Sequence, residues 1–105
     1  MDKRKIAQYR TGLIVDVLGE IWRRYRGHVI WGLWHKHGGR YYFEVDIRGD
    51  LATAQKIVAD LFRELDNRGI WVRQLGPLKW VVKKSGDKVW RLSARARVFS
   101  IPYPN

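Results

Sequence analysis

The sequence predicts an α+β fold, an antiparallel β-sheet with two helices on one face, in the order α-ββ-α-βββ. Two stretches with apolar residues at three- and four-residue spacing predict the helices. Five runs rich in β-branched and aromatic residues predict the strands, and short glycine-containing connections between them favour antiparallel neighbours. With 105 residues the chain is expected to form a single nucleic-acid-binding domain, residues 1–105, without a second core.

Both helices have recognisable ends. The first is expected from Asp2, a natural N-cap, to about Arg26. The second is expected from the N-cap Asp50 to about Asn67, where Gly69 stops it. Each helix has one apolar stripe, and we expect both stripes to cover the same side of the sheet.

The first two strand runs, residues 28–36 and 40–48, are joined by Gly38-Gly39, which suits a two-residue hairpin turn. That turn would pair Trp34 with Phe43. One face of the hairpin would then hold the core residues Ile30, Gly32, Trp34, Tyr41, Phe43, Val45 and Ile47. The other face would hold Val29, Trp31, Leu33, His35, Arg40, Tyr42, Glu44, Asp46 and Arg48.

The last three runs, residues 70–75, 78–84 and 88–99, are separated by Gly76-Pro77 and by residues 85–87. If Gly76-Pro77 and Gly86-Asp87 are two-residue loops, both registers agree on two faces. The core face would hold Ile70, Val72, Val81, Trp90, Leu92 and Ala94. The opposite face would hold Trp71, Arg73, Trp80, Val82, Lys84, Arg91, Ser93, Arg95 and Arg97. The segment 100–105, with two prolines, is expected to be extended.

Strict alternation from Trp90 to Val98 indicates a strand with one apolar and one basic side. Arg91, Arg95 and Arg97 stand on that basic side, two or four residues apart. Either acidic neighbours on adjacent strands neutralise these charges, or the face meets an anionic partner.

The charge balance favours the anionic partner. The chain has 21 Lys and Arg against 10 Asp and Glu, a net charge of +11, and such a bias most often accompanies nucleic-acid binding. There is no cysteine, which excludes disulfides and thiolate metal sites. No apolar run approaches the roughly 20 residues of a membrane span, and we expect a soluble cytoplasmic protein with no membrane partner.

Aromatic and basic residues share the predicted open face, which suits binding of a single nucleic-acid strand. Rings stack on unpaired bases while cations hold phosphates. The alternative is that these rings fill a second core or an oligomer interface. The predicted binding residues are Trp31, His35, Arg40, Tyr42, Trp71, Arg73, Trp80, Lys84, Arg91, Arg95 and Arg97.

A catalytic alternative is a metal-dependent nuclease. Glu44 and Asp46 lie two apart on one strand near two histidines, and residues 12–20 faintly resemble the LAGLIDADG homing-endonuclease signature. In that family the acid of the motif ends its helix, whereas here the helical pattern runs on. We therefore expect no enzyme activity, no cofactor and no metal site.

A broader resemblance is to the single-stranded-DNA-binding proteins of hyperthermophilic archaea called ThermoDBP, and to their short related proteins. It includes size, basicity, element order and tryptophan-rich strands such as Val29–Trp34 and Ile70–Arg73. The resemblance implies a thermophilic archaeal protein that binds single-stranded DNA, or RNA, in an aromatic cleft with a basic rim, largely independently of base sequence. It also implies a homo-oligomer, a dimer or tetramer, although the zipper-like C-terminal helix of the longer members is missing from this sequence.

Overall fold

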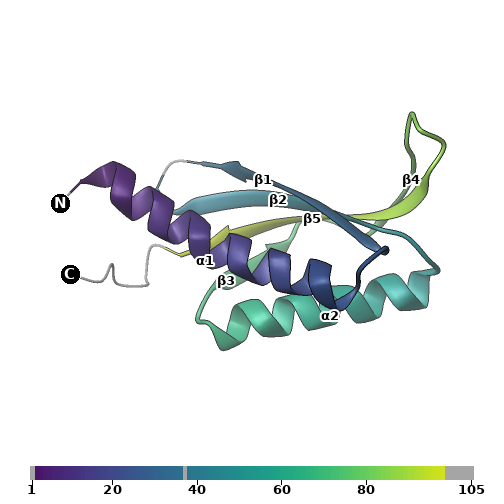
Figure 1. Ribbon diagram of the computed structural model, residues 1–105, viewed down its shortest axis with the longest axis horizontal. Helices are drawn as coiled ribbons and strands as arrows, with labels where there is room; N and C mark the ends of the chain where they lie inside the picture. The colour runs from purple at the N-terminus through teal and green to yellow at the C-terminus, as the bar shows by residue number, and fades with distance from the viewer. Residues whose placement is uncertain (1, 37, 99–105) are drawn as a thin grey trace.

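The computed structural model describes residues 2–36 and 38–98, apart from the side chain of His35. The expected extended segment, 100–105, and the last residue of the final strand run, Phe99, lie outside the described residues. The elements are α1 (Lys3–Arg24), β1 (Val29–His35), β2 (Arg40–Ile47), α2 (Leu51–Asn67), β3 (Trp71–Gln74), β4 (Lys79–Val82) and β5 (Lys88–Arg97). This order confirms the predicted α+β class (Figure 1).

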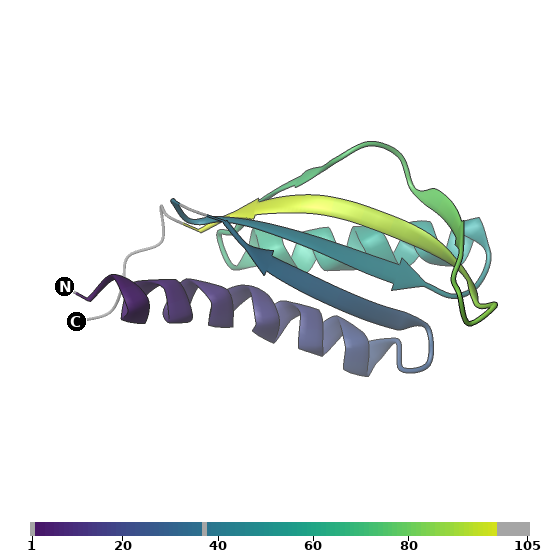
Figure 2. The same cartoon turned by 90° about the horizontal axis from the view of Figure 1, so that it is seen from above.

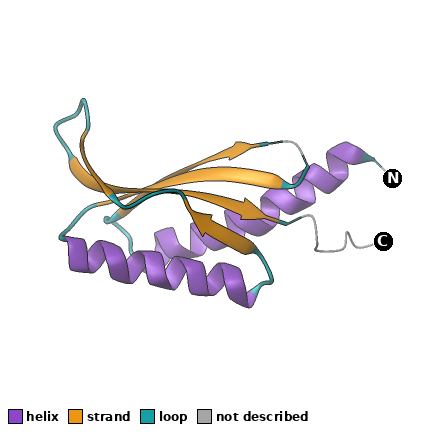
Figure 3. Cartoon of the chain, turned by 180° about the vertical axis from the view of Figure 1, so that it is seen from behind, coloured by secondary structure: helices purple, strands orange, loops and turns teal. Residues whose placement is uncertain are grey.

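All strand pairings are antiparallel, and the sheet order is β1-β2-β5-β3, with β4 also paired to β5. Both helices lie on one side of the sheet, as predicted (Figure 3). Figure 2 looks onto the other side, where β1 forms one edge and β3 with β4 forms the opposite edge. We call this uncovered side of the sheet the open face.

The predicted caps start both helices. The carboxylate of Asp2 accepts a hydrogen bond from the Arg4 N–H at 2.9 Å, and that of Asp50 accepts from the Thr53 N–H at 2.8 Å. Each cap satisfies an N–H that the helix itself leaves unpaired. Neither described helix combines the length and the apolar character needed to cross a membrane.

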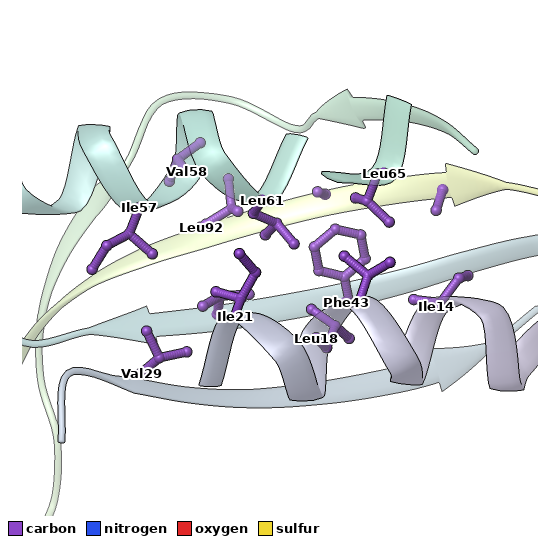
Figure 4. Packing of buried hydrophobic residues seen from close by; sticks show 14 of the residues in the cluster. Ile14, Leu18, Ile21, Val29, Phe43, Ile57, Val58, Leu61, Leu65 and Leu92 are labelled. Atoms are coloured by element: carbon purple, nitrogen blue, oxygen red, sulfur yellow. The ribbon is translucent and has the colours of Figure 1, made fainter. Parts of the chain in front are cut away.

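The core lies between the two helices and the sheet (Figure 4). Its large side chains are fully buried, and burial of each such side chain contributes roughly 1.5–3 kcal/mol. The helices supply Ile14, Val17, Leu18, Ile21, Ala54, Ile57, Val58, Leu61 and Leu65. The sheet supplies, among others, Val29, Tyr41, Phe43, Val45, Ile47, Leu92, Ala94 and Ala96.

The register of the first hairpin differs from the predicted one. Val29 is opposite Ile47 and Leu33 is opposite Phe43, a shift of one residue. The Lys36 N–H donates to the Arg40 carbonyl at 2.9 Å, so three residues connect the strands instead of two. The connection includes Gly38 and Gly39, with φ of 70° and 75°, which other residues rarely adopt. The prediction for β1 is therefore inverted, because a slip of one residue exchanges the two faces of a strand.

The predicted β3–β4 hairpin is also wrong. Both strands pair with β5, with Trp71 opposite Arg97 and Lys79 opposite Arg91. Gly76-Pro77 therefore interrupts one edge strand, a position where proline's missing N–H costs no ladder hydrogen bond.

The β4–β5 loop is one residue longer than predicted. The Lys83 N–H donates to the Asp87 carbonyl at 2.8 Å, which leaves residues 84–86 as the loop. Trp80 consequently faces Trp90, and not the arginines of β5. This hairpin curls away from the helices (Figures 1 and 3), so the helix layer does not cover Trp80, which is 50% exposed.

Candidate nucleic-acid interface

Side chains on the open face form rows that run across the strands, because directly paired residues have their Cβ atoms about 5 Å apart. Three or four strands contribute to each row. In order along the sheet, the rows are Arg40, Arg97 and Trp71; Trp34, Tyr42, Arg95 and Arg73; Gly32, Glu44 and Ser93; and Ile30, Asp46, Arg91 and Lys79. We call the residues Arg40, Tyr42, Trp71, Arg73, Arg95 and Arg97 the arginine end. We call Asp46, Arg91, Lys79 and the nearby Lys83 the carboxylate end.

The arginine end concentrates positive charge beside exposed rings. Arg95 lies directly between Tyr42 on β2 and Arg73 on β3, and like charges in such a pair destabilise a sheet. Within the described residues neither Arg73 nor Arg95 forms an ion pair, and the Arg95 Nε is buried without a hydrogen-bond partner. Trp71 is 68% exposed and lines a hollow of about 160 Å³ together with these arginines. An anion bound here would relieve the repulsion.

The carboxylate end is neutralised from within the protein. Arg91 donates from Nε to Asp46 Oδ1 at 2.8 Å and from Nη2 to Oδ2 at 3.1 Å, and Lys83 Nζ lies 3.2 Å from Oδ2. Burial alone would raise the pKa of Asp46, but the hydrogen bonds from Arg91 and Lys83 outweigh it and hold this pKa below its usual value. The same hydrogen bond raises the pKa of Arg91, because it stabilises the charged guanidinium. Arg91 is thus a structural ion-pair partner.

A groove of about 560 Å³ lies across β1, β2 and β5 between the two ends. Lys36 Nζ lies 5.7 Å from the centre of the Tyr42 ring, within range of a cation–π contact. Trp34 is half exposed. The groove is lined by Trp34, Lys36, Tyr42, Phe43, Glu44, Leu75, Ser93 and Ala94.

Most carboxylates of the described residues lie outside the open face. Glu20 and Glu64 accept from Arg68 at 2.6 and 2.9 Å on the helix layer, where Arg24 joins the same network. The open face has Glu44 and Asp46, and Asp46 is committed to Arg91 and Lys83. The arginine end therefore holds four arginines and no carboxylate.

The structure brings together most, though not all, of the predicted binding residues. Arg40, Tyr42, Trp71, Arg73, Arg91, Arg95 and Arg97 lie on the open face. Trp31 does not, because the shifted register packs it, partly buried, against the core. Trp80 faces Trp90 at 4.9 Å between ring centres, Lys84 lies in the β4–β5 loop, and the backbone of His35 is paired with Tyr41 of the buried row.

The sequence-based prediction missed three residues of this surface, namely Trp34, Lys36 and Lys79. Trp34 takes the place on β1 that Trp31 was expected to occupy. Lys79 takes the place of Trp80 on the edge strand. Had a three-residue loop after Lys36 been assumed, the prediction would have placed Trp34 and not Trp31 on the open face, since loop length fixes the register of a hairpin.

The nuclease alternative gains no support from these positions. Among residues 2–36 and 38–98, no three His, Asp or Glu side chains are grouped to hold a metal ion. Asp46 is occupied by two cations, and Asp16 of the LAGLIDADG-like stretch is exposed in the middle of α1, which continues to Arg24.

No protein-family model matches this chain, and no curated relative was found. The interpretation of the site consequently depends on its geometry and charge.

Proposed function

We propose that the protein binds single-stranded nucleic acid on the open face of its sheet, at the arginine end. The observation that carries this proposal is the pair of neighbouring cross-strand rows in which Tyr42 and Trp71 lie beside four arginines. Rings stack on unpaired bases whatever their identity, and guanidinium groups hold phosphates, so binding is largely independent of base sequence.

The rows run perpendicular to the strands, which suggests the path of the ligand. Neighbouring strands are about 4.8 Å apart, so the row from β1 to β3 spans roughly 14 Å. One subunit therefore binds only a short stretch of the strand. A duplex would not expose base faces to Trp71 and Tyr42, and only phosphate contacts would remain.

The ligand is DNA by the resemblance to ThermoDBP proteins, with RNA as the variant to be tested beside it. The same resemblance suggests a homo-oligomer, and the sequence pattern suggests that it is cytoplasmic. Several subunits would place several short sites along one strand, which raises the overall affinity without new contacts.

Quenching of tryptophan fluorescence by a thymine oligonucleotide tests this function. We expect saturable quenching that weakens with added salt, and much weaker binding of a duplex of equal length. Arg73→Ala should reduce the affinity, whereas Lys56→Ala on the exposed side of α2 is the matched loss of one charge and should have little effect. Equal or tighter binding of the duplex would contradict the proposal.

A second candidate is an assembly module, favoured by an apolar groove beside α2. This groove has a volume of about 500 Å³ and lies between α2 and the interrupted edge strand, with Val58, Phe62, Leu78 and Trp90 among its lining residues. Trp80 and Val82 are exposed on the adjoining hairpin. Sedimentation of Phe62→Glu against the unchanged protein separates the two functions: loss of an oligomer with oligonucleotide binding intact would assign assembly to this groove.

A further inference from the structure

We propose that the groove between Trp34 and Ser93 is a subsite for one guanine base, with Trp34 as the stacking surface and Glu44 as the group that reads the base. This inference rests on the proposed binding of a single strand, and it adds a base preference at one position of an otherwise sequence-tolerant site.

The six-membered ring of the Trp34 indole lies beside Gly32. A Cβ atom at Gly32 would lie 3.4 Å from Cη2, 3.7 Å from Cζ2 and 3.8 Å from Cζ3 of Trp34. These are ordinary van der Waals distances, so the ring lies directly beside Gly32, and the Trp34 side chain is 50% exposed. Glycine at residue 32 places no side chain against the ring, and the exposed part of Trp34 is available for stacking.

Glu44 is the residue on β2 directly opposite Gly32, and it lines the same groove as Trp34. On its other side, Ser93 of β5 donates a hydrogen bond from Oγ to Glu44 Oε2 at 3.5 Å. Within the described residues no lysine or arginine forms an ion pair with Glu44, in contrast to Asp46. The carboxylate thus stays available to accept hydrogen bonds from a base stacked on Trp34.

A carboxylate at this position discriminates among bases. Guanine presents two neighbouring donors, N1–H and the N2 amino group, which match the two oxygens of a carboxylate. Cytosine and adenine place an acceptor nitrogen beside their amino group, and thymine flanks its one N–H with carbonyl oxygens, so each would set an acceptor against the Glu44 oxygens. Reading of an unpaired base on its Watson–Crick edge is the usual mode for single strands.

The position of Glu44 also orients the nucleotide. Its negative charge repels phosphate, whereas Arg95 and Arg73 attract it one row away, about 7 Å along the strands. The backbone is therefore held at the arginine end, and the base extends over Trp34 towards Glu44.

Fluorescence anisotropy with three labelled oligonucleotides tests the subsite: all thymine, thymine with one central guanine, and thymine with one central inosine, which lacks the N2 amino group. The unchanged protein should bind the guanine oligonucleotide roughly tenfold more tightly than the other two. Glu44→Gln should abolish this preference while retaining binding. Asp66→Asn, the matched removal of one negative charge from the exposed end of α2, should keep it.

Two results would overturn the subsite while the proposed function stands: equal affinities of the unchanged protein for all three oligonucleotides, or a guanine preference that survives in Glu44→Gln. Failure of all three oligonucleotides to bind at low salt would instead overturn the proposed function and the subsite together. Because inosine changes the ligand and not the protein, this comparison does not depend on how any variant folds.

Discussion

Arg91 and Arg95 lie four residues apart on one strand and face the same side of the sheet, yet their surroundings differ. Arg91 is opposite Asp46 and forms two hydrogen bonds with it. Arg95 is opposite Tyr42 on one side and Arg73 on the other, without an ion pair among the described residues. The cross-strand neighbour therefore determines whether an arginine stabilises the fold or remains available to a ligand.

The largest effect should follow from removing the acid of the carboxylate end. Asp46→Ala leaves Arg91 and Lys83 without their carboxylate, and we expect it to lower the free energy of unfolding by roughly 2–4 kcal/mol. Urea denaturation measures this change, with Asp66→Ala as an exposed control. A destabilisation by Asp46→Ala no larger than that of the control would mean that the ion pair contributes little.

Trp71→Ala should act on binding alone. The ring is 68% exposed, so we expect a stability change within about 0.5 kcal/mol and a loss of roughly 1–3 kcal/mol in binding per stacked base. The slope of affinity against salt should not change, because a ring releases no counterion. Trp31→Ala, which removes a ring packed on the core, should instead destabilise the protein by about 2 kcal/mol or more. Unfolding of the Trp71→Ala protein would instead show that this ring stabilises the fold, as Trp31 is expected to do.

The two arginines should respond in opposite ways. Arg95→Ala is expected to lower the salt slope by about 0.7 for each phosphate that is no longer neutralised, and to leave stability unchanged or a few tenths of a kcal/mol higher, since it removes a repulsion with Arg73. Arg91→Ala should destabilise the protein and leave the salt slope nearly unchanged. Salt titrations and urea denaturation of both variants test this difference. Equal salt slopes in the two variants would contradict the assignment of Arg95 to phosphate binding and of Arg91 to the fold.

The smallest effect is a pH dependence. The pKa of Asp46 is lowered in the folded protein, so its contribution to stability is fully present above the unfolded value of about 3.9 and is lost as pH falls through the lower folded value. Asp50 and Glu64 also have lowered pKa values, so they contribute to the same loss of stability at low pH. Asp46→Asn should therefore lose less stability than the unchanged protein as the pH falls from about 5 to about 2, and parallel pH curves would contradict this.

The helices, the core and the alternation of β5 could be predicted from the sequence because their patterns admit one interpretation. β1 could not, since both of its alternating rows are apolar: Val29, Trp31 and Leu33 on one side, and Ile30 and Trp34 on the other. Only the loop length distinguishes these rows, and the loop is one residue longer than predicted. The pairing of Asp46 with Arg91 joins two strands through residues 45 positions apart, which local patterns do not contain.

The central place of β5 has a consequence for how the chain folds during synthesis. β5 is the last of the five strands to be made, yet it is the strand that pairs with β2, β3 and β4. Until β5 leaves the ribosome, the nascent chain has the β1–β2 hairpin and two amphipathic helices. Their apolar faces stay partly exposed, because the core side chains of β5 are not yet present to cover them. Closing the long loop between β2 and β5 should limit the folding rate. A chain stalled before Lys88 should accordingly be a substrate for chaperones, whereas a chain that includes β5 should not be.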